Sequence, residues 1–182
     1  DVQLFPSCRT FAFTAGLLRP RIYVSSRLAE ELSDDEYQAV LLHETGHRIR
    51  RDGLRIFSAQ LLSGAHFPTV RRALLQELRL ATEQSCDEYA AFSLGDRLTV
   101  AEAIVKLTRM TNLPQLHQYA YQAFNASDCE KRVTGLLKPP IPRRRSLSVL
   151  GFTLLLAMSI GGAVTADFWH HGVESLLGIY LG

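Results

Sequence analysis

The chain has 182 residues, of which 47% are hydrophobic and 21% are charged, so it can bury one modest core and we expect one folded domain. The formal net charge of +2 is too small to indicate a nucleic-acid partner. The cysteines Cys8, Cys86 and Cys129 are odd in number and widely spaced, which argues against a disulfide framework and is typical of a reducing compartment.

The first predicted element is a short β-hairpin. Phe11 to Ala15 and Arg21 to Ser25 are β-prone runs, and Gly16 and Pro20 separate them. An extended peptide can add to the edge of such a hairpin, because main-chain groups at an edge lack partners. We therefore expect this edge to hold a substrate segment.

The next element is a helix that carries a metal-binding motif. Ser33 and Glu36 have the spacing of a capping box, which predicts the start of the helix. Farther along, His43-Glu44-Thr45-Gly46-His47 has the pattern H-E-x-x-H. Residues four apart share a helix face, so both histidines can bind one Zn²⁺ while Glu44 acts as the base on a water at the metal. The alternative is two surface histidines beside an ion-paired glutamate, because five residues can match by chance.

The segment Leu54 to Val70 is apolar but contains breaks at Arg55, Gly64, His66 and Pro68. It is too interrupted to cross a membrane unaided, and we expect it to contact the membrane interface instead.

The later part of the domain is predicted to be helical, because its apolar residues keep helical spacing. The predicted helices cover about Arg71 to Leu94, Val100 to Thr111 and Asp128 to Leu137. Capping boxes are predicted at the start of the last two, from Thr99 with Glu102 and from Ser127 with Glu130.

A third metal ligand is predicted on the first of these helices. A catalytic zinc takes three protein ligands and leaves one position for water, so Glu83 is expected to join His43 and His47. Asp87, one turn later, is expected to hold a ligand histidine by its second ring nitrogen. Glu83 could instead be an ordinary surface acid. Cys86 is a conceivable ligand, but a small buried helix residue is the favoured interpretation.

A membrane anchor is predicted after the domain of residues 1–137. Residues 138–145 form a linker rich in proline and arginine, and Ser146 to Ala166 then runs without a charge. That length crosses a hydrocarbon core of about 30 Å as a helix, although a buried core helix is the alternative. Arg143 to Arg145 lie on its amino side, which predicts a cytoplasmic domain and an extracytoplasmic tail over 167–182.

The ordered set of motifs resembles the membrane metalloprotease domain of antibiotic-sensing receptors of the BlaR/MecR type. The likeness covers roughly Phe11 to Leu137 and rests on Leu17 to Val24, the H-E-x-x-H motif, Arg51-Asp52 and Glu83 to Asp87. A more distant similarity is to the HtpX and CAAX prenyl protease group, through H-E-x-x-H followed by E-x-x-x-D.

The resemblance implies zinc held by His43, His47 and Glu83, with Glu44 acting on water. It also implies that Asp87 supports a ligand and that Arg132 braces the active site, since residues 130–137 resemble the end of these domains. It implies a cytoplasmic protein substrate, such as a transcriptional repressor or the protease itself. The receptors carry a large sensor after their last membrane helix, and only residues 168–182 follow the span here, so antibiotic sensing is not supported.

Together these features predict a mainly α (α+β) fold: a helical zincin-like metalloprotease domain with a short N-terminal β-hairpin, followed by one transmembrane helix. The expected function is a membrane-anchored zinc endopeptidase that cleaves a cytoplasmic or membrane-proximal protein in regulatory signalling. The expected location is a bacterial inner membrane. The alternatives are a catalytically silent module that binds a regulator, a quality-control protease and a purely structural zinc site. The donor for the oxyanion is left open among Tyr89, His117, Tyr119, Tyr121 and Arg132.

Overall fold

The computed structural model describes residues 2–65, 67–111 and 119–138. These residues form a mainly helical domain with a small sheet at its N-terminus, as predicted. The predicted span over 146–166, its tail over 167–182 and all of the linker except Lys138 lie outside the described residues. Within the described ranges, no helix is both long and apolar enough to cross a membrane.

The sheet has three strands in the order β1-β3-β2. The hairpin of β2 (Ala12–Ala15) and β3 (Arg21–Ser25) is antiparallel and confirms the predicted pair of strands. β1 (Val2–Phe5) pairs in parallel with β3 and was not predicted. Its four residues are too few for an alternating pattern to be read from the sequence. β2 is consequently an edge strand.

The helices follow the strands along the chain. They are α1 (Ser26–Glu31), α2 (Asp34–Arg50), α3 (Asp52–Leu62), the 3₁₀ turn η1 (Ser63–Ala65), α4 (Pro68–Leu94), α5 (Arg97–Thr111) and α6 (Tyr119–Leu137). The capping box at the start of α2 is confirmed: the Ser33 hydroxyl accepts from the Glu36 N–H at 3.3 Å, and the Glu36 carboxylate accepts from the Ser33 N–H at 2.8 Å.

Three predicted helix starts are wrong. α4 begins at Pro68 rather than near Arg71, because proline is well suited to the first turn of a helix. α5 begins two residues before Thr99, since Asp96 accepts hydrogen bonds from the N–H groups of Leu98 and Thr99 and caps the helix instead. α6 begins at Tyr119, which places Ser127 inside the helix rather than at its cap.

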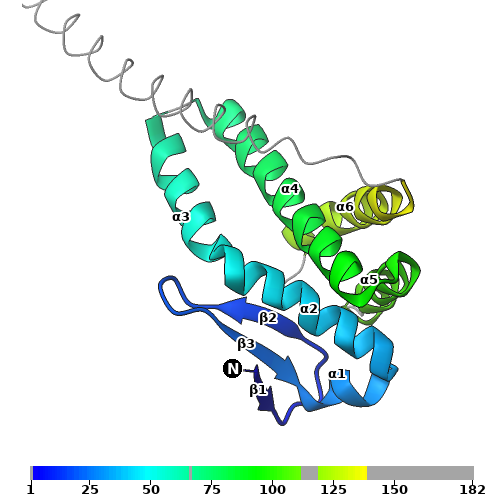
Figure 1. Ribbon diagram of the computed structural model, residues 1–182. Coiled ribbons are helices and arrows are strands. Elements are labelled where there is room, and N and C mark those ends of the chain that lie inside the picture. The colour runs from blue at the N-terminus through cyan, green and yellow to red at the C-terminus, as the bar shows by residue number, and fades with distance from the viewer. Residues whose placement is uncertain (1, 66, 112–118, 139–182) are drawn as a thin grey trace, which may run out of the picture.

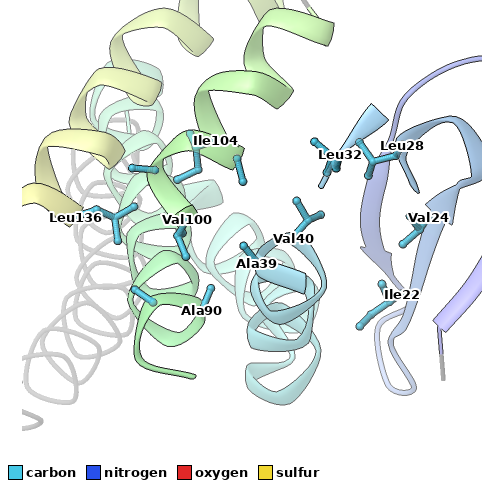
Figure 2. Packing of buried hydrophobic residues seen from close by; sticks show 13 residues of the cluster. Ile22, Val24, Leu28, Leu32, Ala39, Val40, Ala90, Val100, Ile104 and Leu136 are labelled. Carbon is cyan, nitrogen blue, oxygen red and sulfur yellow. The ribbon is translucent and has the colours of Figure 1, made fainter. Parts of the chain in front are cut away.

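The core lies on both sides of α2 (Figure 2). On one side Val40 lies near the buried Val24 of β3 and Leu28 of α1. On the other, Ala39 faces the side where Val100 of α5 and other buried residues of α4 to α6 gather. The motif helix is therefore fixed between the sheet and the later helices (Figure 1).

Candidate active site

The motif helix α2 and helix α4 approach each other closely at Gly46. A side-chain carbon added at Gly46 would lie 3.2 Å from Cys86 Sγ, which is tighter than an ordinary contact. The glycine inside the motif therefore allows α4 to come near enough for Glu83 to reach the two histidines.

The structure brings the three predicted ligands together. His43 Nε2 lies 3.1 Å from His47 Nε2 and 3.4 Å from Glu83 Oε2, and His47 Nε2 lies 3.5 Å from Glu83 Oε1. Two nitrogens and a carboxylate, on two helices, thus converge on one point.

These separations fit a tetrahedral zinc ion. With zinc–nitrogen and zinc–oxygen bonds of about 2.0–2.2 Å, two ligand atoms of a tetrahedron lie about 3.4 Å apart. The three observed distances run from 3.1 to 3.5 Å. The donor set of two imidazoles and one carboxylate also suits zinc and leaves a fourth position for water.

Each histidine has its second nitrogen against a buried carboxylate. His43 Nδ1 lies 2.9 Å from Asp87 Oδ1, and His47 Nδ1 lies 3.1 Å from Asp52 Oδ2. Such pairs fix the ring orientation and leave Nε2 free to face a metal. Asp87 thus lies beside a histidine of the motif, and its support of a metal ligand stays a prediction.

Sequence reasoning missed the matching role of Asp52. Helical spacing alone does not place it beside His47, because α2 ends at Arg50 and the next residue, Arg51, has a left-handed conformation with φ of 52°. That turn starts α3 in a new direction and buries Asp52 to 2% exposure. The signal that the sequence offers is the pair Arg51-Asp52, which belongs to the motifs of the family resemblance.

Arg132 joins Asp87 and Glu83 from helix α6. Its Nε and Nη2 donate to the two oxygens of Asp87, both at 2.8 Å, and its Nη1 lies 3.2 Å from Glu83 Oε2. A guanidinium fork of this kind fixes a carboxylate in position. A second arginine holds α6 itself, since Arg97 Nε donates to the Leu136 carbonyl at 2.6 Å and its Nη atoms pair with Glu88.

The charges of this cluster shift its pKa values strongly. Burial would lower the pKa of His43, but its hydrogen bonds with Asp87 and Glu83 raise it to about 9. Burial would raise the pKa of Glu83, but His43 and Arg132 lower it to about 2. Burial opposes ionisation of Asp87 as well, and Arg132 and His43 bring the pKa of Asp87 to about 2. In the metal-free protein, His43 is therefore protonated below about pH 9, and its positive charge offsets part of the negative charge of Asp87 and Glu83.

Glu44, the predicted catalytic base, is 7% exposed, and its carboxylate contacts a residue of the sheet. Thr14 Oγ1 on β2 lies 2.7 Å from Glu44 Oε2 and 3.0 Å from the Glu44 main-chain oxygen. A hydroxyl has one proton, so it donates to one of these acceptors at a time. The edge strand thereby touches the base, a contact that no local sequence pattern predicts.

A cleft of about 640 Å³ lies over these residues. β2 forms one wall, and apolar residues of α5 form another, among them Val100, Ala103, Ile104 and Leu107. The Ser25 N–H donates to the Phe11 carbonyl, and the alternation of antiparallel pairing then turns the main-chain groups of Ala12 and Thr14 away from β3. No other described strand pairs with that edge.

Two residues that the sequence left open can now be placed. Cys86 is fully buried, and its Sγ lies 3.5 Å from Asp52 Oδ2, where burial and the nearby carboxylate raise the pKa of the thiol. It is thus a buried helix residue and disfavoured as a thiolate ligand. Of the oxyanion candidates, Tyr89 lines a different cavity between α4 and α6, whereas Arg132 lines both that cavity and the cleft. His117 lies outside the described residues, and the side chains of Tyr119 and Tyr121 are not described.

Comparison with protein families gives a match to peptidase family M48 over residues 3–130. Neither the curated proteins nor the solved structures gave a match. Since the match covers more than half of the chain, the protein belongs to peptidase family M48, a family of zinc metallopeptidases. This supports the metalloprotease part of the resemblance drawn from the sequence.

Proposed function

We propose that this member of family M48 is a membrane-anchored zinc endopeptidase. The observation that carries the proposal is the convergence of His43, His47 and Glu83, each within 3.1–3.5 Å of the next, beside the buried carboxylate of Glu44. An incidental cluster of surface histidines would have no buried acids behind both rings. The role of each residue follows from this arrangement.

His43, His47 and Glu83 would hold the metal, which when bound lowers the pKa of a water towards neutrality and polarises the scissile carbonyl. The Glu44 carboxylate accepts the proton of the attacking water and returns it to the leaving amine, so two peptides are released. Asp87 and Asp52 keep the imidazoles oriented, and Thr14 keeps the Glu44 carboxylate aimed at the cleft.

The substrate is an extended peptide segment that adds to the free edge of β2. The main-chain groups of Ala12 and Thr14 supply the pairing, and their position on the wall of the cleft brings the added strand past Glu44. The apolar α5 wall favours hydrophobic substrate side chains next to the cleavage point.

The uncharged run Ser146 to Ala166 supports membrane anchoring, and Arg143 to Arg145 support a cytoplasmic catalytic domain in a bacterial inner membrane. The likeness to receptors of the BlaR/MecR type supports regulatory cleavage of a cytoplasmic protein, such as a transcriptional repressor or the protease itself. Reporter fusions after residue 182 and near Arg50 test this topology: protection of the C-terminal tag together with outside labelling near Arg50 would reverse it.

Metal analysis and cleavage of labelled casein test the peptidase. The full chain should bind one zinc and cut the probe, Glu44→Gln should keep zinc and lose cleavage, and His43→Ala should lose both. Glu102→Gln, at an exposed acid on α5, is the matched control and should behave as the wild type. Equal cleavage by Glu44→Gln would exclude the mechanism, and zinc binding with no cleavage by any form would favour the silent or structural alternative.

A further inference from the structure

The structure contains a helical arm whose apolar residues are not buried. We define the arm as Leu54 to Ala81, which covers most of α3, η1 and the first half of α4. No hydrophobic residue described in this stretch is buried, although leucine is its commonest residue. α3 and the start of α4 extend away from the sheet (Figure 1).

The exposed fraction of the apolar side chains is greatest at the tip of the arm, where α3 ends and α4 begins. Leu61 is 72% exposed and Phe67 82%, and Phe57 and Val70 are about half exposed. Phe57 and Leu61 are four residues apart and share one face of α3. All residues from Phe67 to Ala73 are exposed, so none of the side chains in the first turn of α4 is buried against other described residues. Clustered large apolar side chains of this kind mark an interaction surface.

The charges of the arm all have one sign near the tip. No aspartate or glutamate occurs from Gly53 to Gln76, whereas Arg71 and Arg72 lie in the exposed start of α4. Neither arginine has a carboxylate partner among the described residues. Cations near the N-terminus of a helix are unfavourable, so these arginines are not there to stabilise α4. They provide a basic rim beside the apolar tip.

We propose that this arm lies in the interface of an anionic lipid bilayer. Phe57, Leu61, Phe67 and Val70 enter the acyl boundary, and Arg71 and Arg72 bind headgroup phosphates. The helices of the arm are too short or too polar to cross a bilayer, so the arm lies in the surface instead. The inference rests on exposure and charge and does not depend on peptidase activity.

A second copy of the chain fits the surface less well. Symmetric pairing of the tips would bring Arg71 and Arg72 of both copies together, with no acidic residue from 53 to 76 to oppose them. A lipid surface offers both the apolar layer and the negative charge.

Depth-sensitive labelling of the full chain in vesicles tests the proposal. An environment-sensitive fluorophore is attached to one cysteine that replaces Phe57, Leu61 or Val70. The same chain carries Cys8→Ser and Cys129→Ala, so that the introduced cysteine takes the label. The matched control is Phe92, an 89% exposed apolar residue near the other end of α4. Vesicles contain phosphatidylcholine with a minority of phosphatidylglycerol, and the quencher is a nitroxide on the lipid chain.

The labels on the arm should be quenched at least about threefold more strongly than the label at position 92. Equal quenching would overturn the proposal. A blue-shifted emission at position 61 without lipid quenching would also overturn it, because the tip would then be covered by protein.

The basic rim is tested in the same vesicles with Arg71→Gln and Arg72→Gln combined. Quenching at position 61 should fall in anionic vesicles and stay unchanged in pure phosphatidylcholine. The control pair Arg109→Gln and Lys131→Gln removes two exposed charges elsewhere and should have no effect. Equal quenching of the rim variant and its control in anionic vesicles would overturn the role of the arginines.

Discussion

The candidate active site and the arm share helix α4 but differ in the kind of side chain that each of them buries. The second half of α4 buries ionised groups, since Asp87 is 1% exposed, whereas the first half exposes apolar ones such as Val70. Soluble proteins normally do the opposite in both cases. The comparison teaches that function can be sought where burial departs from the ordinary rule: we propose a metal site in one region and a contact with lipid in the other.

The two regions should also differ in what holds them together. Around the site, the charges of Arg132, Asp87, His43 and Asp52 are each matched by a partner within hydrogen-bond distance. In the arm, none of the described hydrophobic residues is buried, and Leu61 and Phe67 near its tip are 72% and 82% exposed. Substitutions should therefore be costly in the first region and mild in the second, and the following predictions test that difference.

The largest effect is expected from Arg132→Met. It leaves Asp87 buried without the two hydrogen bonds that the guanidinium group donates, and such a loss typically costs about 3–5 kcal/mol of stability. Urea unfolding of the full metal-free chain in mild detergent measures the loss. Arg132→Lys retains the charge but not the two-point contact and should lie between the variant and the wild type. A cost below that of an ordinary surface substitution would show that the site does not depend on this pair.

Next in size is the loss of metal affinity in Asp52→Asn and Asp87→Asn. Each acid orients one histidine by its second nitrogen, and removal of such a partner weakens zinc by about 10–100-fold. Competition with a zinc-sensitive dye measures the change. Asp128→Asn is the matched control, because Asp128 also lines the cleft and forms no ion pair with a histidine among the residues that the structure describes. Unchanged affinity in Asp52→Asn would contradict the role found for this residue.

The metal-free site should respond to pH in two directions. The pKa of His43 is raised from 6.5 to about 9, so its contribution to stability is full below 6.5 and is lost as the pH rises through 9. The pKa of Asp87 is lowered from 3.8 to about 2, so its contribution is present above 3.8 and is lost as the pH falls through 2. Stability in the presence of a chelator should thus decrease between pH 6.5 and 9, whereas zinc affinity should increase there, because the metal replaces the proton.

Asp87→Asn supplies the control for this pH dependence. It removes the strongest partner of the charged His43, and stability should then change less between pH 6.5 and 9. A wild-type protein that becomes more stable over this range would contradict the protonated form of His43.

A smaller coupling is expected between Thr14 and Glu44. In a cycle of Thr14→Val, Glu44→Ala and the double variant, a bond to the carboxylate gives a coupling free energy of about 1 kcal/mol. If the hydroxyl bonds only the main-chain oxygen of Glu44, the two substitutions are additive. The cycle is measured by unfolding of the metal-free chain and so does not rely on catalysis. Thr14→Ser should restore the coupling, and in the active enzyme it should restore kcat.

The sequence predicted much of this molecule because its main signals are local. Capping at Ser33, the i, i+4 spacing of His43 and His47, and the β-hairpin all depend on residues close together in the chain. The contacts of Asp52 with His47 and of Thr14 with Glu44 depend on a left-handed turn at Arg51 and on the packing of a strand against a helix. Neither has a sequence pattern of its own.

The smallest effect is expected from Leu61→Ser, at the exposed tip of the arm. Leu61 is 72% exposed, whereas Leu28 on α1 is fully buried, so the two leucines differ mainly in their surroundings. Leu28→Ala should cost about 2–5 kcal/mol because it leaves a cavity in the core. Leu61→Ser should change the free energy of unfolding by less than about 0.5 kcal/mol, since no core contact is lost. Urea unfolding of both variants in the same detergent makes the comparison direct. If Leu61→Ser were as costly as Leu28→Ala, the arm would be packed against protein, and the contrast between the two halves of α4 would not hold.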